Sequence, residues 1–600
     1  MFKLFTMFSK RDWILLVIAI CFIVAGVWID LTVPEYLGEL TNLITNPLAG
    51  GTTAQVLEAG FFMLLFSLGS MITAIIVAFL GSIVASSLGA RIRKGVTEKV
   101  SDFSTAEMKK FSVASLITRS TNDVTQVQLF TVMAIQMLVR GPIIAVWAVL
   151  KILDSSWELS LVTFIAVAAL VVLLTILIIV VLPKFNKIQK LTDKINQVSR
   201  ENLTGLRVVR AYNASEFEEA KFECANNNLA KNNLVVNRSM GLFWPFMSLL
   251  LSGLTVAIYW VGSWLISGGQ EGPEFLAEMM MFGQYATQII FAFMMMIMVL
   301  VMLPRSLVSG KRINEVLKTE PTVVSATNCK HSIDGESNYD ITFDNVEFHY
   351  PGAEESVLSD VSITIPQGKT VAFIGGTGSG KSTLVNLLPR IYDATGGKIS
   401  IGGVCVRDMS LEALNDVVGY IPQTATIFNG TIRSNIAFGE VSENAKDGIK
   451  KARDITDQDI EQALKTSQAW EFVSQLEKGL DYEVSQSGKN LSGGQKQRLA
   501  IARVVVRRPK IYIFDDTFSA LDYRTDKNLR EALKRETSGA TVLIVAQRIG
   551  TIKDADQIYV LDKGKIVGQG KHNELMKTCE VYRETALSQL SKEELEDGRK

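Results

Sequence analysis

The sequence predicts two kinds of structure in series: an α-helical membrane domain of six long transmembrane helices with cytoplasmic extensions, then an α/β domain. The chain up to about Leu303 consists of long runs with few charges, whereas charges are frequent beyond about Pro321. The later part alternates strand-like and helix-like patterns, which is typical of an α/β fold with a largely parallel sheet. The expected boundaries are 1–320 for the membrane domain, 321–340 for a linker, 341–580 for the α/β domain and 581–600 for a tail.

Six apolar runs are long enough to cross a membrane, because a helix needs about 20 apolar residues to span a hydrocarbon core of about 30 Å. The fourth run contains no charge, so we do not expect it to be a buried helix of a soluble protein. We do not expect the first run to be a cleaved signal peptide, since Asp30 follows it directly and five runs come after it. The runs are Trp13–Ile29, Val56–Ile83, Phe130–Ile152, Leu159–Leu182, Met240–Ile266 and Met279–Leu303.

Lysine and arginine are unevenly distributed among the connections between these runs. The connection from run two to run three holds seven of them and the connection from run four to run five holds ten. Residues 30–55 and 267–278, which connect the first two and the last two runs, hold none. Because basic residues are enriched in cytoplasmic loops, we expect a multi-pass cell-membrane protein with both termini and the α/β domain in the cytoplasm.

The two basic connections are too long for turns and carry helical periodicity. We interpret them as membrane helices that continue into the cytoplasm, with tips near Ala106–Phe111 and Leu206–Phe217 that contact a cytoplasmic domain. The alternative is a pair of solvated helical hairpins that contact nothing.

Two features of the membrane part concern a transported compound. The sixth run holds eight methionines between 279 and 302, with Gln284 and Gln288 on one helical face. Methionine is flexible and polarisable, which suits a surface that accepts many apolar shapes, although ordinary packing explains it equally well. Arg140 is the cationic residue inside the third run, and we expect it to snorkel toward the cytoplasmic interface. The alternative is a position facing the bundle interior.

The α/β part contains a glycine-rich loop of the kind that binds phosphate groups. Gly375–Ser382, GGTGSGKS, matches G-x-x-x-x-G-K-[ST] and directly follows the strand-like run Thr370–Ile374. In such a loop backbone N–H groups surround phosphates, the lysine supplies a charge and the hydroxyl ligates Mg²⁺. The following helix directs its positive end at the same anion, so the sequence predicts a bound nucleoside triphosphate. The expected contacts come from Gly375, Gly376, Thr377, Gly378, Ser379, Gly380, Lys381, Ser382 and Thr383.

Further patterns in this part fit a nucleotide site. The run Val418–Gln423 ends at Gln423, a candidate contact to Mg²⁺ or water. Leu491–Gln495, LSGGQ, is a glycine-rich turn that precedes an amphipathic helix. The N-terminus of that helix is a second candidate anion-binding site. Lys510–Asp516, KIYIFDD, is an apolar strand that ends in carboxylates, where an Mg²⁺-binding aspartate is expected. Tyr350 ends a strand-like run ahead of the loop, and its ring has two interpretations, stacking on adenine or ordinary packing.

These motifs in this order resemble the ATP-binding cassette (ABC) transporters, specifically exporter half-transporters in which six spans precede one nucleotide-binding domain. The resemblance implies ATP and Mg²⁺ as ligands. It also implies a dimer, because in this family each ATP lies between one subunit's Walker A and the other's signature. The two tips resemble the family's coupling helices. The motif assignments are Gly375–Ser382 for Walker A, Tyr350 for the A-loop, Gln423 for the Q-loop, LSGGQ for the signature, Asp515 for Walker B and Ser519–Asp522 for the D-loop.

The chain departs from the family pattern at Val484–Gly488, where exporters usually have V-G-E-R-G, and at two positions of the catalytic site. The residue after the Walker-B aspartate is normally the glutamate that polarises water, and here it is the shorter Asp516. The switch histidine falls where Gln547 stands, and an amide does not carry the imidazole's proton. With an intact LSGGQ, these losses resemble the degenerate-site subunit of a bacterial heterodimeric multidrug-type exporter. The implied catalytic set is Asp516, Gln547, Gln423 and Ser492, with Mg²⁺ contacts from Ser382, Gln423 and Asp515 and signature contacts from Ser492, Gly493, Gly494 and Gln495.

We therefore expect a subunit of an ATP-driven exporter of amphipathic or hydrophobic compounds, which works in membrane lipid with a second half-transporter. A slow homodimer, a lipid or peptide exporter, and an ATP-gated regulatory or channel-like subunit are the alternatives. The 61 basic and 61 acidic residues balance, so nucleic acid is not an expected partner. Five scattered cysteines without a C-x-x-C pair indicate a reduced compartment and no zinc site.

Overall fold

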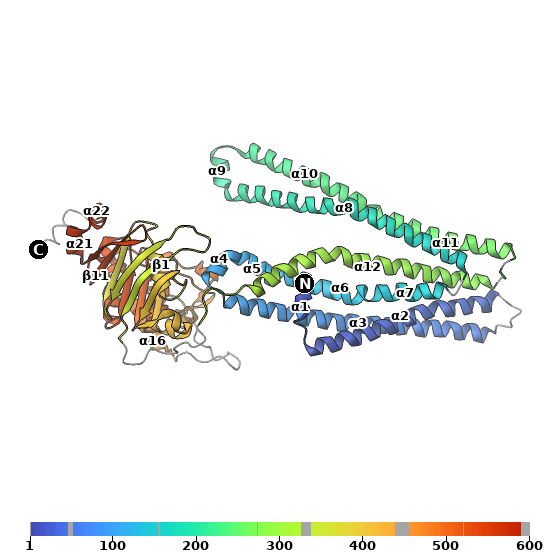
Figure 1. Cartoon of the computed structure of the whole chain (residues 1–600), viewed down its shortest axis with the longest axis horizontal. Helices are drawn as coiled ribbons and strands as arrows, with labels where there is room; N and C mark the ends of the chain where they lie inside the picture. Colours follow the sequence, from blue (N-terminus) through green and yellow to red (C-terminus); the bar gives the residue numbers. More distant parts are fainter. Residues whose placement is uncertain are drawn as a thin grey trace. The chain divides into compact units, whose positions relative to one another are not determined.

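A computed structural model describes residues 2–45, 52–153, 156–269, 271–272, 274–325, 338–438, 455–519 and 521–589. The chain forms two compact units, which Figure 1 shows in sequence colours. Unit 1 comprises Met1–Ser101 and Ala114–Lys318, and unit 2 comprises Asp102–Val113 and Thr319–Lys600. Most of the expected linker, and the expected tail beyond Gln589, lie outside the described residues.

The described residues of unit 1 form helices joined by short turns, and six of the helical segments are long and apolar enough to cross a membrane. Each of the six predicted runs coincides with one of these segments to within one residue at its ends or lies inside it, so the prediction of six spans is confirmed. The helices are α1 (Phe2–Phe5), α2 (Lys10–Thr45), α3 (Thr53–Ser101), α5 (Val113–Ser120), α6 (Asn122–Met133), the π-helix η2 (Ala134–Leu138), α7 (Arg140–Leu153), α8 (Trp157–Thr204), α9 (Leu206–Ala211), α10 (Ser215–Gly241), α11 (Phe243–Ser267) and α12 (Phe275–Lys318).

The predicted helical extensions are present. Helix α8 has 48 residues, which at 1.5 Å per residue corresponds to about 70 Å, more than twice a hydrocarbon core. Short helices occur at both predicted tips: α4 (Thr105–Phe111), which belongs to unit 2, and α9, which joins α8 to α10 in unit 1 (Figure 1). Ser104 and Glu107 form a capping box at the start of α4, which explains why a new helix begins there.

Unit 2 is an α/β domain with a six-stranded sheet in the order β12-β11-β3-β10-β9-β6 and a four-stranded sheet in the order β2-β1-β4-β5. In the larger sheet β6, β9, β10, β3 and β11 are parallel, and β12 is antiparallel to β11. The strands are β1 (Ile341–Phe348), β2 (Leu358–Ile365), β3 (Thr370–Gly375), β4 (Gly396–Ile401), β5 (Val404–Cys405), β6 (Val418–Ile421), β7 (Gly430–Thr431), β8 (Glu483–Val484), β9 (Ile511–Asp515), β10 (Thr541–Val545), β11 (Gln557–Asp562) and β12 (Lys565–Gly570).

Strands β9 and β10 are buried along their whole length, which explains their uninterrupted apolar sequences. Because β3, β6, β9 and β10 are parallel, the loops that follow them meet at one edge of the sheet. The helices of unit 2 besides α4 are α13 (Lys381–Leu387), α14 (Leu411–Val417), α15 (Ile432–Ile436), α16 (Asp457–Thr466), α17 (Trp470–Val473), α18 (Gly493–Val505), α19 (Tyr523–Glu536), α20 (Ile549–Ile552), α21 (His572–Thr578) and α22 (Glu580–Gln589), with short 3-10 turns at 406–408, 479–481 and 486–488.

Candidate functional site

The glycine-rich loop connects β3 to α13 and requires glycine at two points. A Cβ on Gly375 would stand 2.0 Å from the carbonyl oxygen of Leu561, and one on Gly380 would stand 2.8 Å from the Leu358 side chain. Gly380 also has φ 98°, in the left-handed region that favours glycine. The loop therefore wraps closely around the N-terminal end of α13, an arrangement suited to holding an anion.

Lys381 lies across this loop and is buried. Its Nζ donates to the carbonyl oxygens of Gly375 and Gly376 at 2.9 and 2.7 Å. Burial lowers the pKa of Lys381, while the carboxylates of Asp515 and Asp516 oppose that shift. The ammonium is thus held at the mouth of the loop by carbonyl groups, where it is available to a phosphate.

Two of the three residues expected to hold Mg²⁺ meet in the structure, Ser382 and Asp515. Ser382 Oγ donates to Asp515 Oδ1 at 2.6 Å, and the Tyr420 hydroxyl donates to Asp515 Oδ2 at 3.3 Å. Burial, together with the charge of Asp516, raises the pKa of Asp515. A hydroxyl and a carboxylate are oxygen ligands of the kind that Mg²⁺ prefers, so the two residues fit this ion.

Asp516 is the meeting point of the two glutamines selected from the sequence. Its Oδ2 accepts from Gln423 Nε2 at 2.9 Å and from Gln547 Nε2 at 3.1 Å. The backbone supports this geometry, since Asp516 has φ 48° and its N–H donates to Val545 O at 2.9 Å. The parallel register of β6, β9 and β10 thus brings two glutamines from separate stretches of the chain onto the Asp516 carboxylate.

Tyr350 lies in an aromatic cluster within unit 2. Its hydroxyl is 3.0 Å from Thr383 Oγ1, and its ring meets Phe348 and Tyr392 edge to face, with centroid distances of 5.0 and 5.3 Å. Lys109 Nζ, from α4, lies 4.9 Å from the Tyr350 ring centroid and 5.5 Å from that of Tyr392. The neighbouring Tyr392 raises the pKa of Lys109, which keeps a cation at this ring. Sequence reasoning missed Lys109 and Tyr392, because only the fold brings them to Tyr350.

The LSGGQ turn forms the N-terminal cap of α18. Ser492 caps α18: its Oγ accepts from Gln495 N at 3.3 Å, and Gln495 Oε1 accepts from Ser492 N at 2.8 Å. Ser492 and Gly493 are exposed, and a Cβ on Gly493 would meet nothing within 4 Å. The N-terminal end of α18 is therefore an open, positively polarised surface. In the Ser519–Asp522 segment, Ser519 Oγ donates to Asp516 O at 2.8 Å, and Ala520 lies outside the described residues.

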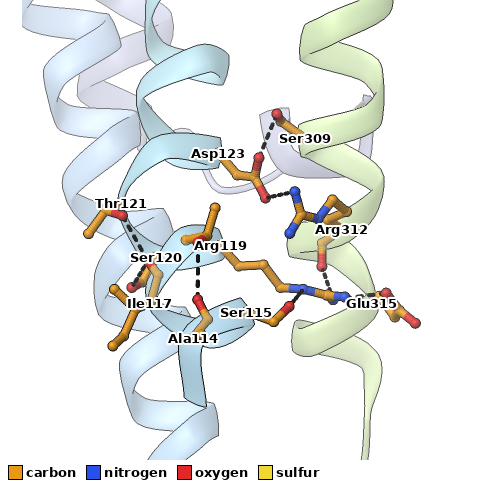
Figure 2. A network of polar contacts seen from close by, with 11 residues as sticks. Ala114, Ser115, Ile117, Arg119, Ser120, Thr121, Asp123, Ser309, Arg312 and Glu315 are labelled. Atoms are coloured by element: carbon orange, nitrogen blue, oxygen red, sulfur yellow. Dashed lines mark hydrogen bonds and ion pairs between the residues drawn. The ribbon is translucent and has the colours of Figure 1, made fainter. Parts of the chain in front are cut away.

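A polar network in unit 1 joins α5 and α6 to α12 (Figure 2). Arg119 reaches across to α12, where it donates to Glu315 Oε2 and to the carbonyl oxygen of Arg312, both at 2.8 Å. One turn away, buried Asp123 accepts from Ser309 Oγ at 2.8 Å and pairs with Arg312 at 3.4 Å. These contacts tie the segment that follows α4 to the helix that leads into unit 2.

Arg140 does not behave as the sequence suggested. Its guanidinium pairs with Asp30 of α2, and it lines two cavities within unit 1, so the expectation of snorkelling toward an interface is wrong. The interior position that we held as the alternative is the one observed, because a carboxylate on a neighbouring helix is within reach. The methionines of α12 occupy different environments. Met279 is buried against Gly262, whereas Met295 lines both cavities.

Comparisons with known proteins match both halves of the chain. The family model described as "ABC transporter transmembrane region" matches residues 16–303, and the one described as "ABC transporter" matches residues 358–519. An uncharacterized ABC transporter ATP-binding protein of Mycobacterium tuberculosis is 37% identical over 548 residues, which covers 91% of this chain and 92% of that protein. An ATP-dependent lipid A-core flippase of Haemophilus ducreyi is 29% identical over 562 residues and 92% of each chain. The solved structure of a bacterial Atm1-family ABC exporter with ATP bound has a similar fold, with a TM-score of 0.76, 24% identity, and coverage of 97% of this chain and 99% of that one.

Proposed function

Because this chain belongs to the ABC exporters that join a six-helix transmembrane region to an ATP-binding domain, we propose that it is the degenerate-site subunit of a heterodimeric exporter. The proposed cargo is amphipathic or hydrophobic compounds of the multidrug type, moved out across the cell membrane. The observation that carries the proposal is Asp516, which stands where the family has glutamate and whose Oδ2 accepts from both Gln423 and Gln547. Neither amide accepts a proton as a histidine would.

In this proposal the chain's own pocket binds ATP and hydrolyses it slowly. The backbone N–H groups of Gly375–Ser382 hold the phosphates, Lys381 supplies positive charge, and Tyr350 supports the adenine. Ser382, Asp515 and Gln423 hold Mg²⁺, which when bound neutralises charge on the phosphates. Asp516 is one methylene shorter than glutamate, and a misplacement of about 1 Å at a catalytic group lowers a rate by roughly 100-fold.

The same chain supplies a complete signature to its partner. The exposed N-terminal end of α18, with Ser492, Gly493, Gly494 and Gln495, closes the partner's nucleotide site. The second tip supports an assembly, because it exposes apolar side chains: Tyr212 is 81% exposed and Phe217 is 70% exposed. Exposed apolar patches often mark protein–protein interaction sites, so we assign this tip to contact with the partner's ATP-binding domain.

The proposed orientation places both termini and the ATP-binding domain in the cytoplasm, on the basis of the lysine and arginine distribution. The relatives named as lipid A-core flippases favour one second candidate, a lipid exporter. A peptide exporter or an ATP-gated channel-like subunit has no such support among these relatives. The remaining alternative is a homodimer with two equal, slow nucleotide sites, which would contradict the proposed difference between a slow site and a hydrolysing site.

The composition of the native assembly tests the proposal. We expect mass measurement of the transporter, extracted from its own membrane, to find one copy of this chain and one copy of a second half-transporter. The pair, reconstituted in vesicles, should move amphipathic compounds in an ATP-dependent manner. Assemblies that contain only copies of this chain and hydrolyse ATP rapidly would overturn the heterodimer. Ion conductance without stoichiometric ATP use would select the channel-like subunit instead.

Lys109 gives a second test of the pocket. We expect Lys109→Met to weaken ATP binding at this chain's pocket by about fivefold, because a cation near an aromatic ring contributes about 1 kcal/mol to the ring's interactions. Lys109→Arg should retain the affinity, since it retains the charge. Equilibrium binding of ATP and of inorganic tripolyphosphate to the full-length assembly measures the effect.

The neighbouring exposed Lys110 is the matched control, since its Nζ lies over Phe111 rather than over Tyr350. Lys110→Met should leave ATP binding unchanged. Tripolyphosphate, which has no base, should bind all variants equally. Equal losses in the two methionine variants, or a loss of tripolyphosphate binding, would show that Lys109 acts through general charge and not through the ring.

A further inference from the structure

Four helices of unit 1 bring polar side chains to one point in the membrane part. Asp30 of α2 accepts from Ser70 Oγ of α3 and pairs with Arg140 of α7. Gln288 of α12 donates from Nε2 to the carbonyl oxygen of Asp30 at 3.3 Å. We call Asp30, Ser70, Arg140 and Gln288 the polar cluster. It lies within segments that are apolar enough to cross a membrane, so its charges call for a functional explanation.

The polar cluster lies deep along the helices. Asp30 and Arg140 stand 15 and 13 residues before the ends of α2 and α7, which at 1.5 Å per residue places both about 20 Å from those ends. Both residues therefore lie within segments that are long and apolar enough to cross a membrane, Lys10–Thr45 and Val113–Leu153, and not at the far ends of those segments. Charges at that depth are expensive, and they usually face a bundle interior and mark the path of a substrate.

The polar cluster borders two cavities. One has a volume of about 440 Å³ and is lined by Asp30, Ser70, Arg140 and Gln288 with apolar Phe291 and Met295. The other, of about 190 Å³, includes Arg140 in its lining and is otherwise lined mainly by apolar residues of α2 and α3. A lining that combines polar and apolar side chains is suited to an amphiphile.

Arg140 and Asp30 both have hydrogen-bonding capacity left over. Arg140 has five N–H donors, and among the described residues its buried Nε has no acceptor. Each carboxylate oxygen of Asp30 has about two acceptor positions, and the contacts with Ser70 and Arg140 use one on each oxygen. The π-helix Ala134–Leu138 ends just before Arg140 and inserts an extra residue into that turn, a local feature frequent at functional sites.

The opposite charges of Asp30 and Arg140 cancel, and this favours a ligand head group without net charge. A singly charged head group would leave a net charge in a low-dielectric space, whereas a zwitterion would not. We propose that the polar cluster binds the head group of a zwitterionic amphiphile, its anionic group at Arg140 and its cationic group at Asp30. This inference rests on the proposed function and names the cargo class for it.

The test uses three photoactivatable probes that share one alkyl chain and differ in the head: phosphocholine, a methyl-capped phosphate (a phosphodiester with one negative charge) or trimethylammonium. Saturable labelling of α7 and α12 peptides in the full-length assembly gives the apparent affinity of each head. The wild-type protein should prefer phosphocholine over either singly charged head by about tenfold, because unbalanced charge is disfavoured. Asp30→Asn should shift the preference to phosphate, and Arg140→Gln should shift it to trimethylammonium.

Lys151→Gln is the matched control, since Lys151 of α7 pairs with Glu35 at 2.5 Å and lines neither cavity. It should keep the wild-type preference. The proposal fails if wild-type protein labels equally with all three heads, or if the Asp30 and Arg140 variants shift the preference in the same direction. ATP-dependent movement of a different head group, without phosphocholine selection, would leave the exporter proposal intact and overturn only the zwitterion site.

Discussion

Ser492→Arg in this chain is expected to reduce ATP hydrolysis by the assembled transporter by roughly 100-fold, the scale seen when a positioned electrostatic group is removed from a catalytic site. Ser492 caps α18, and its hydroxyl lies at the exposed end of that helix. Arginine removes the cap and adds a large side chain where the partner's nucleotide is to be closed. Steady-state turnover of the purified pair measures the effect.

Two other substitutions separate this explanation from simple damage. Thr456→Arg removes an equivalent exposed capping box, at the start of α16 in the same domain, and should leave turnover nearly unchanged. Lys381→Ala should weaken nucleotide retention at this chain's own pocket and lower turnover far less than Ser492→Arg. If Lys381→Ala abolishes all turnover while Ser492→Arg does nothing, the two sites have the opposite roles to those proposed.

Asp516→Glu combined with Gln547→His is expected to raise hydrolysis at this chain's own pocket by roughly 100-fold. The longer carboxylate reaches the attacking water, and the imidazole restores a group that carries a proton near the γ-phosphate. The double substitution is needed because Gln547 Nε2 donates to Asp516 Oδ2, so changing either residue alone disturbs the other.

The gain in hydrolysis is best measured in a protein that already carries Ser492→Arg. In that variant the partner's site is disabled, so the remaining turnover comes from the pocket that contains Asp516. The double substitution should restore hydrolysis there, and Lys381→Ala should remove the restored activity. No gain in this background would show that Asp516 and Gln547 do not limit the rate, and that the pocket is slow for another reason.

Local sequence is sufficient for features that depend on one stretch of chain. The glycine-rich loop is recognisable because its glycines, Lys381 and Ser382 are adjacent and all act on one anion. The order β3, loop and α13 follows from an apolar run that stops at Gly375. The tip at α4 is likewise local, since Ser104 and Glu107 start it through a capping box.

Contacts between distant stretches were not predictable from the sequence. Gln423 and Asp516 are 93 residues apart, and only the parallel pairing of β6 with β9 brings them together. Arg140 and Asp30 are 110 residues apart, and hydropathy alone favoured a snorkelling arginine. Lys109 reaches Tyr350 because α4 belongs to the same compact unit as the ATP-binding domain.

Hydrophobic length and motif spacing were therefore enough to establish six spans, an α/β domain and a nucleotide loop. Each depends on energies that act within a segment: burial of an apolar helix in lipid, or backbone N–H groups around a phosphate. Tertiary packing decided how Asp516 is held and how Asp30 neutralises Arg140. Those arrangements depend on strand register and helix contact, which bring side chains together across the fold and leave no periodic trace in the chain.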